Sequence, residues 1–158
     1  MEEQKINVAV LNTEIKLLND KINFIGKSKN NVPISIDYAS PIGDDLGYTS
    51  LELFLLSLSS CIGSSLALLL RKMSKTVSGL EIRAQGVRRT LHPTSFEKIT
   101  LDVVLTSDDI TTQSVDRALA LSEDSICPVW AMIKNSVEVV INYTIVKRQE
   151  KVESNKKS

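Results

Sequence analysis

Residues 53–70 read LFLLSLSSCIGSSLALLL, and this stretch decides the fold. Apolar side chains fill most of its positions, and the interruptions are small residues, namely five serines and Gly63. The pattern predicts one long helix from about Thr49 to Lys75. A helix that is apolar on nearly all sides is typical of the centre of a core, and one small sheet covers only one of its sides. We therefore expect a second copy of the chain to cover the rest, in a homodimer.

The same stretch approaches the length of a transmembrane span, which is the alternative interpretation. Its serines, the flanking Glu52 and Arg71-Lys72, and the strand-like remainder of the chain favour a soluble protein without a membrane partner. Lys and Arg total 19 and Asp and Glu total 19, so no net charge attracts nucleic acid or an anionic surface.

The first residues do not resemble a secretory signal, because no basic region leads into an apolar run within residues 1–7. We therefore expect a cytoplasmic protein. Because the cytosol is reducing, we do not expect its two cysteines to form a structural disulfide.

Strand patterns flank the predicted helix. Before it, apolar residues alternate with polar ones at residues 6–10, 22–24 and 34–38, and Asn19-Asp20 and residues 29–31 supply turns. After it, the pattern predicts two strands, at 80–83 and 99–105, joined by a hairpin turn at 92–94. A helix after Ser114 follows, then a break at Asp124-Ser125. The last predicted elements are a short helix from Pro128 to about Asn135 and a strand at 137–145.

This order of elements predicts an α+β fold. We expect residues 1–147 to form one domain, because no repeat or long linker divides them. Residues 148–158 are charged and lack apolar periodicity, so we expect a disordered tail.

The two cysteines, Cys61 and Cys127, are the candidate reactive groups. Taken alone, two cysteines in a chain of this size are most simply ordinary buried side chains. Cys127 directly precedes Pro128, and proline favours the first helical position, so Cys127 is placed at a helix cap where free N–H groups favour a thiolate. Cys61 lies among small residues, which leave room beside a sulfur or permit another helix to approach. The sequence separation excludes a C-x-x-C motif, so any pairing must come from the fold.

The segment Gly47–Cys61 resembles the G-x-[ST]-P-x-E-L-L-L-x-x-x-x-x-C pattern of the OsmC/Ohr family, with Ser50 in place of the proline. Shorter matches follow in the family's order up to about Val146: Leu70–Met73, Val77–Glu81, Arg88-Arg89 before His92-Pro93, Phe96–Ile99, Leu121–Glu123 and Cys127–Val129. The N-terminal third matches only in strand character. The resemblance is to a divergent, OsmC-like branch.

The resemblance implies an intertwined homodimer with long central helices packed between antiparallel sheets. It also implies thiol-dependent reduction of organic hydroperoxides, in which Cys61 attacks the peroxide and Cys127 resolves the sulfenic acid through a disulfide. An external dithiol then restores the thiols, and no metal, flavin, haem or other cofactor is required. Residue chemistry alone instead nominates Cys127 as the more acidic thiol.

Glu52 is the third candidate catalytic residue, but Thr49-x-x-Glu52 also fits a helix capping box. At about 100° per residue, the nine positions between Glu52 and Cys61 place them on opposite faces of a helix. Hydroperoxide reductases of the family use an N-terminal arginine, whereas this chain has none before Arg71. The candidate substitutes are Lys16, Lys21 and Lys27, although lysine lacks the bidentate guanidinium contact.

Two functions therefore stand side by side. The first is a hydroperoxide reductase of apolar peroxides, with Phe54, Leu58 and Trp130 as pocket wall. The second is a non-catalytic dimer of the same fold that binds an apolar small molecule or senses redox state, which the missing arginine favours. His92 is the only histidine, and with two distant cysteines it makes a poor zinc site.

Overall fold

The computed structural model describes residues 9–148. The chain divides into two compact units between Leu53 and Phe54, within the long helix. The strand predicted at residues 6–10 and the tail predicted at 148–158 fall almost wholly outside the described residues, and residues 9–13 are irregular. The single domain predicted over 1–147 stays a prediction.

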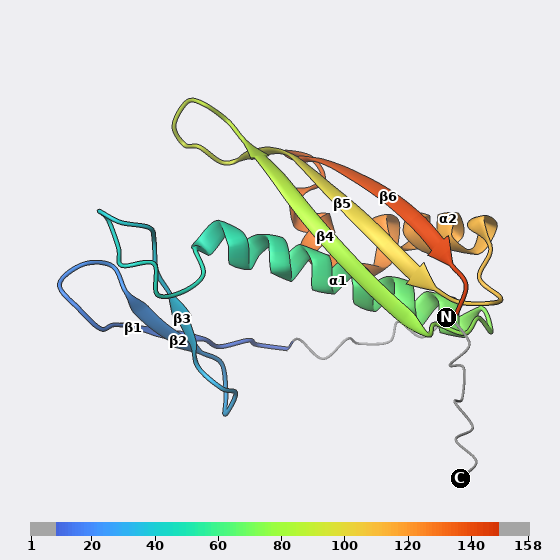
Figure 1. Cartoon of the computed structure of the whole chain (residues 1–158), viewed down its shortest axis with the longest axis horizontal. Coiled ribbons are helices and arrows are strands. Elements are labelled where there is room, and N and C mark those ends of the chain that lie inside the picture. Colours follow the sequence, from blue (N-terminus) through green and yellow to red (C-terminus); the bar gives the residue numbers. More distant parts are fainter. Residues whose placement is uncertain (1–8, 149–158) are drawn as a thin grey trace, which may run out of the picture. The chain divides into compact units, whose positions relative to one another are not determined.

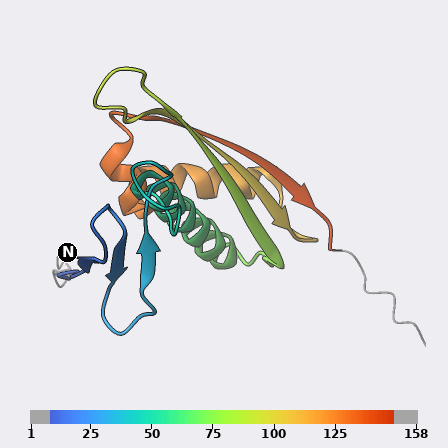
Figure 2. The same cartoon turned by 60° about the vertical axis from the view of Figure 1, so that its left-hand side comes forward.

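The first unit contains a small antiparallel sheet in the order β1-β2-β3, drawn in blue in Figure 2. Its strands are β1 (Glu14–Leu17), β2 (Phe24–Lys27) and β3 (Ile34–Ile36). The predicted turns at Asn19-Asp20 and at residues 29–31 lie between these strands, as expected. Strand β1 was not predicted: its sequence EIKL alternates polar and apolar residues, but over only four positions, and all four are exposed in the structure.

The long helix α1 runs from Ser50 to Lys72, close to the predicted limits. Its length and composition are sufficient for a membrane span, since an 18-residue stretch within it has a mean hydropathy of 2.1. In the second unit, however, one face of α1 is fully buried through Leu58, Ile62, Leu66 and Leu70. Gly63 brings this face against strand β4 (Gly79–Arg88), because a Cβ at Gly63 would stand 3.2 Å from Ile82 Cδ1 and 3.3 Å from Leu80 Cδ2.

The second unit holds a sheet in the order β4-β5-β6, with β5 at Phe96–Thr106 and β6 at Glu138–Val146. Residues 99, 101, 103 and 105 of β5 point into the core, which is the predicted period of two. The α+β class is confirmed, but this sheet is mixed: β4 and β5 are antiparallel, whereas β5 and β6 are parallel. The expectation of purely antiparallel sheets is wrong here because a helical crossover separates β5 from β6.

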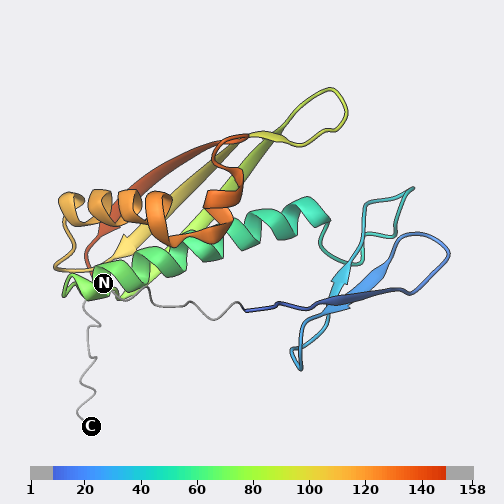
Figure 3. The same ribbon diagram turned by 180° about the vertical axis from the view of Figure 1, so that it is seen from behind.

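That crossover consists of α2 (Thr112–Leu121), a π-helical turn η1 (Ser122–Ile126) and α3 (Pro128–Ile133). Figures 1 and 3 show α2 and the second-unit part of α1 on the same face of the sheet. Thr111 caps α2 in a reciprocal capping box with Ser114. The core of the second unit therefore lies between one sheet face and the helices that carry the two cysteines.

Candidate functional site: a paired cysteine centre

Cys61 sits in the middle of α1 and keeps partial exposure to solvent. Serines nearby in the helix satisfy their hydroxyls locally: Ser65 donates to the Cys61 carbonyl at 2.9 Å, and Ser59 donates to the Leu55 carbonyl at 2.8 Å. Small polar side chains of this kind remain compatible with the helix because they bond back to the preceding turn. The small serines around Cys61 are therefore accommodated within an unbroken helix; room beside the sulfur stays a prediction.

Cys127 is the N-cap of α3, as its position before Pro128 predicted. Its backbone is extended, with φ −85° and ψ 104°, and its Sγ accepts the Trp130 N–H at 3.4 Å. The residue is only 2 % exposed. Proline, which lacks a backbone N–H, fits at the first helical position because an N–H there would have no intrahelical hydrogen-bond partner.

The turn η1 brings Cys127 to the buried side of the chain. Val115, Ala118 and Ser122 are buried at helical spacing, and an unbroken α-helix would next bury residue 126. Instead Ile126 is 48 % exposed and Cys127 is buried. The Cys127 N–H donates to the Ser122 carbonyl at 2.9 Å, the five-residue bond of a π-turn. The break predicted at Asp124-Ser125 is therefore wrong: the chain stays helical there, and the helical turn contains one extra residue.

The structure brings the two cysteines together. Their Sγ atoms lie at disulfide-bonding distance and their Cα atoms are 5.9 Å apart, in the usual range for a disulfide. They are separated by 66 positions in the sequence, so only the packing of α1 against the crossover joins them. The arrangement can hold two electrons reversibly, as a dithiol or as a disulfide.

The predicted pocket wall lies in the same unit. Leu58 and Trp130 are buried, whereas Phe54 is half-buried and its ring centroid lies 6.1 Å from that of Phe96. Phe54 and Leu58 precede Cys61 on α1, and Trp130 follows Cys127 on α3. Their contact with a substrate stays a prediction.

Glu52 forms the capping box that Thr49-x-x-Glu52 predicted. Its Oε2 accepts the Thr49 N–H at 2.7 Å, and the Glu52 N–H donates to Thr49 Oγ1 at 3.3 Å. The carboxylate thus satisfies a backbone donor that the first helical turn leaves free. Its catalytic role stays a prediction.

The candidate substitutes for the arginine lie in the first unit. Lys21 forms an ion pair with Asp44, and the hydrogen bond to that carboxylate raises the pKa of Lys21. Lys27 Nζ lies 3.0 Å from Glu14 Oε1. Lys16 is exposed on β1. Two of the three candidates therefore already have a carboxylate partner.

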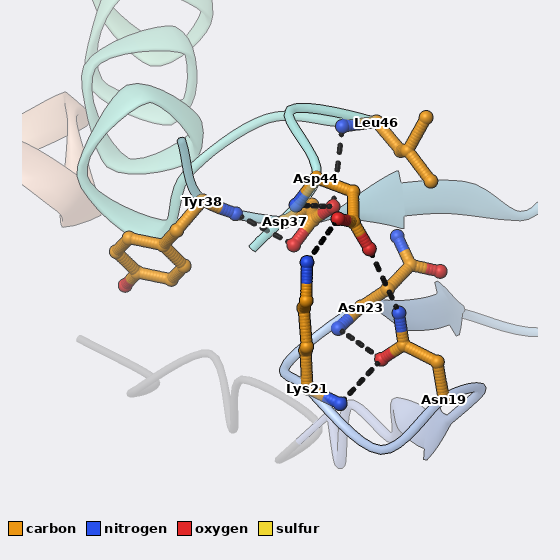
Figure 4. Close-up of polar contacts among 7 residues, drawn as sticks. All are labelled: Asn19, Lys21, Asn23, Asp37, Tyr38, Asp44 and Leu46. Atoms are coloured by element: carbon orange, nitrogen blue, oxygen red, sulfur yellow. Dashed lines mark hydrogen bonds and ion pairs between the residues drawn. The ribbon is translucent and has the colours of Figure 1, made fainter. Parts of the chain in front are cut away.

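A buried carboxylate that sequence reasoning missed orders the loop before α1. Asp37 is fully buried, and its two oxygens accept the backbone N–H groups of Tyr38, Asp44 and Leu46 at 2.8, 3.1 and 3.2 Å (Figure 4). Burial alone would raise the pKa of Asp37, but these hydrogen bonds together lower it. The loop closes tightly at Gly43, where a Cβ would stand 2.2 Å from Asp37 Oδ1. The sequence feature that could have indicated this buried carboxylate is an aspartate directly after a strand and before a glycine-containing loop.

Among residues 9–148, no three His, Cys, Asp or Glu side chains gather closely enough to hold a metal ion. His92 lies with Arg89 and Ser95 beside an open hollow of about 430 Å³ in the β4–β5 connection. The paired cysteines are therefore the chemical centre that the described residues offer.

Comparison with known proteins agrees with this geometry. Residues 43–142 match the family model described as OsmC-like protein. No curated protein matches the sequence. Among solved structures, the chain is similar to a hypothetical protein from Aquifex aeolicus, at 26 % identity and a TM-score of 0.78, over 90 % of this chain and 100 % of that one.

Two further structures share the fold at lower identity. The OsmC-like protein from Mycoplasma pneumoniae is 18 % identical with a TM-score of 0.75, over 87 % of this chain and 98 % of that one. The organic hydroperoxide resistance protein OhrB of Bacillus subtilis is 15 % identical with a TM-score of 0.61, over 86 % of this chain and 98 % of that one.

Proposed function

The chain belongs to the family of OsmC-like proteins, and from this premise we propose that it is a thiol-dependent reductase of organic hydroperoxides. The observation that carries the proposal is the pairing of Cys61 with Cys127 across 66 positions of sequence. A solved structure that shares the fold is named as an organic hydroperoxide resistance protein, which supports the substrate class.

The proposed cycle has two steps at the cysteines. The Cys61 thiolate attacks one peroxide oxygen, the O–O bond breaks, and the alkoxide leaves and takes a proton to become an alcohol. Cys61 is then a sulfenic acid, and the Cys127 thiolate attacks its sulfur, which forms the disulfide and breaks the S–O bond; the departing hydroxide takes a proton and leaves as water. An external dithiol returns the two electrons.

Cys61 takes the attacking role because peroxide must reach the sulfur. Cys61 is partly exposed, whereas Cys127 is 2 % exposed. Residue chemistry favoured Cys127 as the first nucleophile, but a buried sulfur is poorly placed to meet a substrate from solution. Burial suits the resolving thiol, which needs only to reach Cys61.

We propose that the active form is a homodimer in the cytoplasm. On α1, Leu56 and Leu68 are 52 % and 56 % exposed, and on the first sheet Ile15 is 62 % exposed. Apolar surface of this extent on a central helix and on a sheet favours cover by another copy. A reducing compartment supplies the dithiol that the cycle requires.

The second candidate is a non-catalytic dimer of the same fold that binds an apolar small molecule or senses redox state. The absence of arginine before Arg71 favours it, as do the carboxylate partners of Lys21 and Lys27. In this case the cysteine pair would report on the redox state without efficient turnover.

The test measures consumption of cumene hydroperoxide with dithiothreitol for the wild type, Cys61→Ser, Cys127→Ser and the double variant. We expect no turnover in Cys61→Ser or the double variant, and slower turnover in Cys127→Ser than in the wild type, because dithiothreitol must then reduce the sulfenic acid directly. Without dithiothreitol, a dimedone-reactive sulfenic acid should persist in Cys127→Ser but be absent from Cys61→Ser. Serine is the matched replacement because it preserves size. Wild-type activity no greater than that of the double variant would eliminate the reductase and leave the second candidate.

A further inference from the structure

The two sulfurs of the disulfide differ in access. Cys127 is buried at 2 % exposure, whereas Cys61 keeps partial exposure on α1. The side chains one helical turn from Cys61 are Ser57, Leu58, Ser64 and Ser65; Leu58 and Ser65 are buried, whereas Ser57 and Ser64 are exposed. Side chains three and four positions apart share a helix face, so the exposed side of α1 next to Cys61 is formed by small side chains, whereas the chain itself covers Cys127.

The two sulfurs also differ as leaving groups. Thiol–disulfide exchange is faster when the departing sulfur is stabilised as a thiolate and when the attacked sulfur is accessible. Cys127 Sγ already accepts the Trp130 N–H at 3.4 Å, a bond that strengthens when the acceptor carries charge. Cys61 lies in the interior of a 23-residue helix, where backbone N–H groups are committed to carbonyls of the preceding turn. Access and leaving-group stability therefore both favour attack on the sulfur of Cys61 over attack on the sulfur of Cys127.

We propose that the external dithiol attacks Cys61 Sγ and that Cys127 is always the leaving thiolate. One thiolate of the reductant bonds to Cys61 Sγ, and the Cys61–Cys127 bond breaks with its electron pair on Cys127, which then takes a proton. The second thiolate of the reductant attacks the reductant's own sulfur in this mixed disulfide. That step closes the oxidised reductant into a cyclic disulfide and expels Cys61 as a thiolate.

This inference rests on the proposed function and adds its reductive half. Reduction then begins and ends at Cys61, so the same sulfur meets both the reductant and the peroxide. Cys127 never leaves its buried place in the crossover during the cycle.

The experiment maps the first adduct. Oxidised full-length protein is mixed briefly with a monothiol, N-acetylcysteine, then quenched in acid, alkylated with N-ethylmaleimide and digested with trypsin. Cys61 and Cys127 fall on different peptides, because Arg71, Lys98 and Arg117 lie between them. We expect N-acetylcysteine on Cys61 and maleimide on Cys127. Adduct on Cys127, equal adduct on both cysteines, or no adduct on either would each overturn the inference.

A second measurement tests access directly. Leucine at Ser64, in a variant whose oligomeric state by gel filtration equals that of the wild type, should slow reduction of the disulfide by a protein dithiol such as reduced thioredoxin by about tenfold, or ~1.4 kcal/mol in activation free energy. The matched control is Gln85→Leu, which adds the same side chain at an exposed position of β4. Equal slowing in both variants, or none in Ser64→Leu, would contradict approach along this face of α1.

Both measurements start from the oxidised protein and require no peroxide turnover. Adduct on Cys127 would therefore refute the direction of attack while leaving hydroperoxide reduction intact. Failure to consume peroxide would instead refute the proposed function without changing the mapping.

Discussion

Reduction of the Cys61–Cys127 bond should destabilise the protein by an amount that follows from the loop it closes. The two cysteines are 66 positions apart, and a cross-link over a loop of that length lowers the entropy of the unfolded chain by an equivalent of about 4 kcal/mol at room temperature. For a chain of 158 residues, this free energy corresponds to a fall in Tm of roughly 10 °C.

The assay is urea and thermal unfolding of the oxidised and dithiothreitol-reduced wild type at one protein concentration, so that any dimer contributes equally. The control is the Cys61→Ser/Cys127→Ser protein, whose unfolding should not respond to the reductant. A difference between oxidised and reduced wild type below about 1 kcal/mol would refute the reasoning, because the bond would then not constrain the unfolded chain.

Three further predictions concern other parts of the chain. The exchange Ile126→Cys/Cys127→Ile should abolish the disulfide with Cys61, because the π-turn buries position 127 and exposes position 126. Free-thiol titration under non-reducing conditions checks this result. A retained disulfide would mean that the turn adopts an α register. Asp37→Asn should raise amide hydrogen exchange in residues 38–46 at neutral pH. Because the folded pKa of Asp37 is lowered, its stabilisation is present above the pKa of the unfolded chain and is lost as pH falls through the folded value. The protection factor of the wild-type loop, which compares its exchange rate with that of the unfolded chain at the same pH, should therefore fall in acid, whereas that of the variant changes little; parallel acid responses would contradict this. Glu52→Gln should keep the stability of the protein, since glutamine also completes a capping box, whereas Glu52→Ala should lower the free energy of unfolding in urea by about 1 kcal/mol. Peroxidase activity in Glu52→Gln separates a helix cap from a catalytic group. A fall in that activity of about tenfold or more would assign the carboxylate to the chemistry.

The elements with strong periodicity could be predicted from the sequence. The apolar run of α1, the alternation in β5 and the cap at Cys127-Pro128 each carry their own local signal, and the structure confirms all three. Strand β1 was missed because its alternation of polar and apolar residues spans only four positions, too few to stand out from its surroundings.

The parts of the site that depend on packing had no such signal. The π-turn at Ser122–Ile126 adds one residue to a helix, and the polar composition of that segment suggested a break instead. The register that buries Cys127 in place of Ile126 is visible only when the crossover packs against the sheet. The pairing with Cys61 was expected from the family resemblance and not from spacing, because a sequence separation of 66 positions sets no distance in space.

Asp37 illustrates a different limit of sequence reasoning. An isolated aspartate after a strand is most simply an exposed turn residue. Its burial follows from three backbone N–H groups of the next ten residues, which converge on one carboxylate only after the loop has folded around Gly43.

The most direct test of the central claim is a single turnover. Fully reduced protein is mixed with one equivalent of cumene hydroperoxide in the absence of reductant, and the free thiols, the alcohol and the tryptic disulfide peptide are measured together. The account predicts that each peroxide consumed yields one alcohol, removes two thiols and joins the Cys61 peptide to the Cys127 peptide. Unchanged peroxide, or alcohol formed without loss of both thiols, would contradict it.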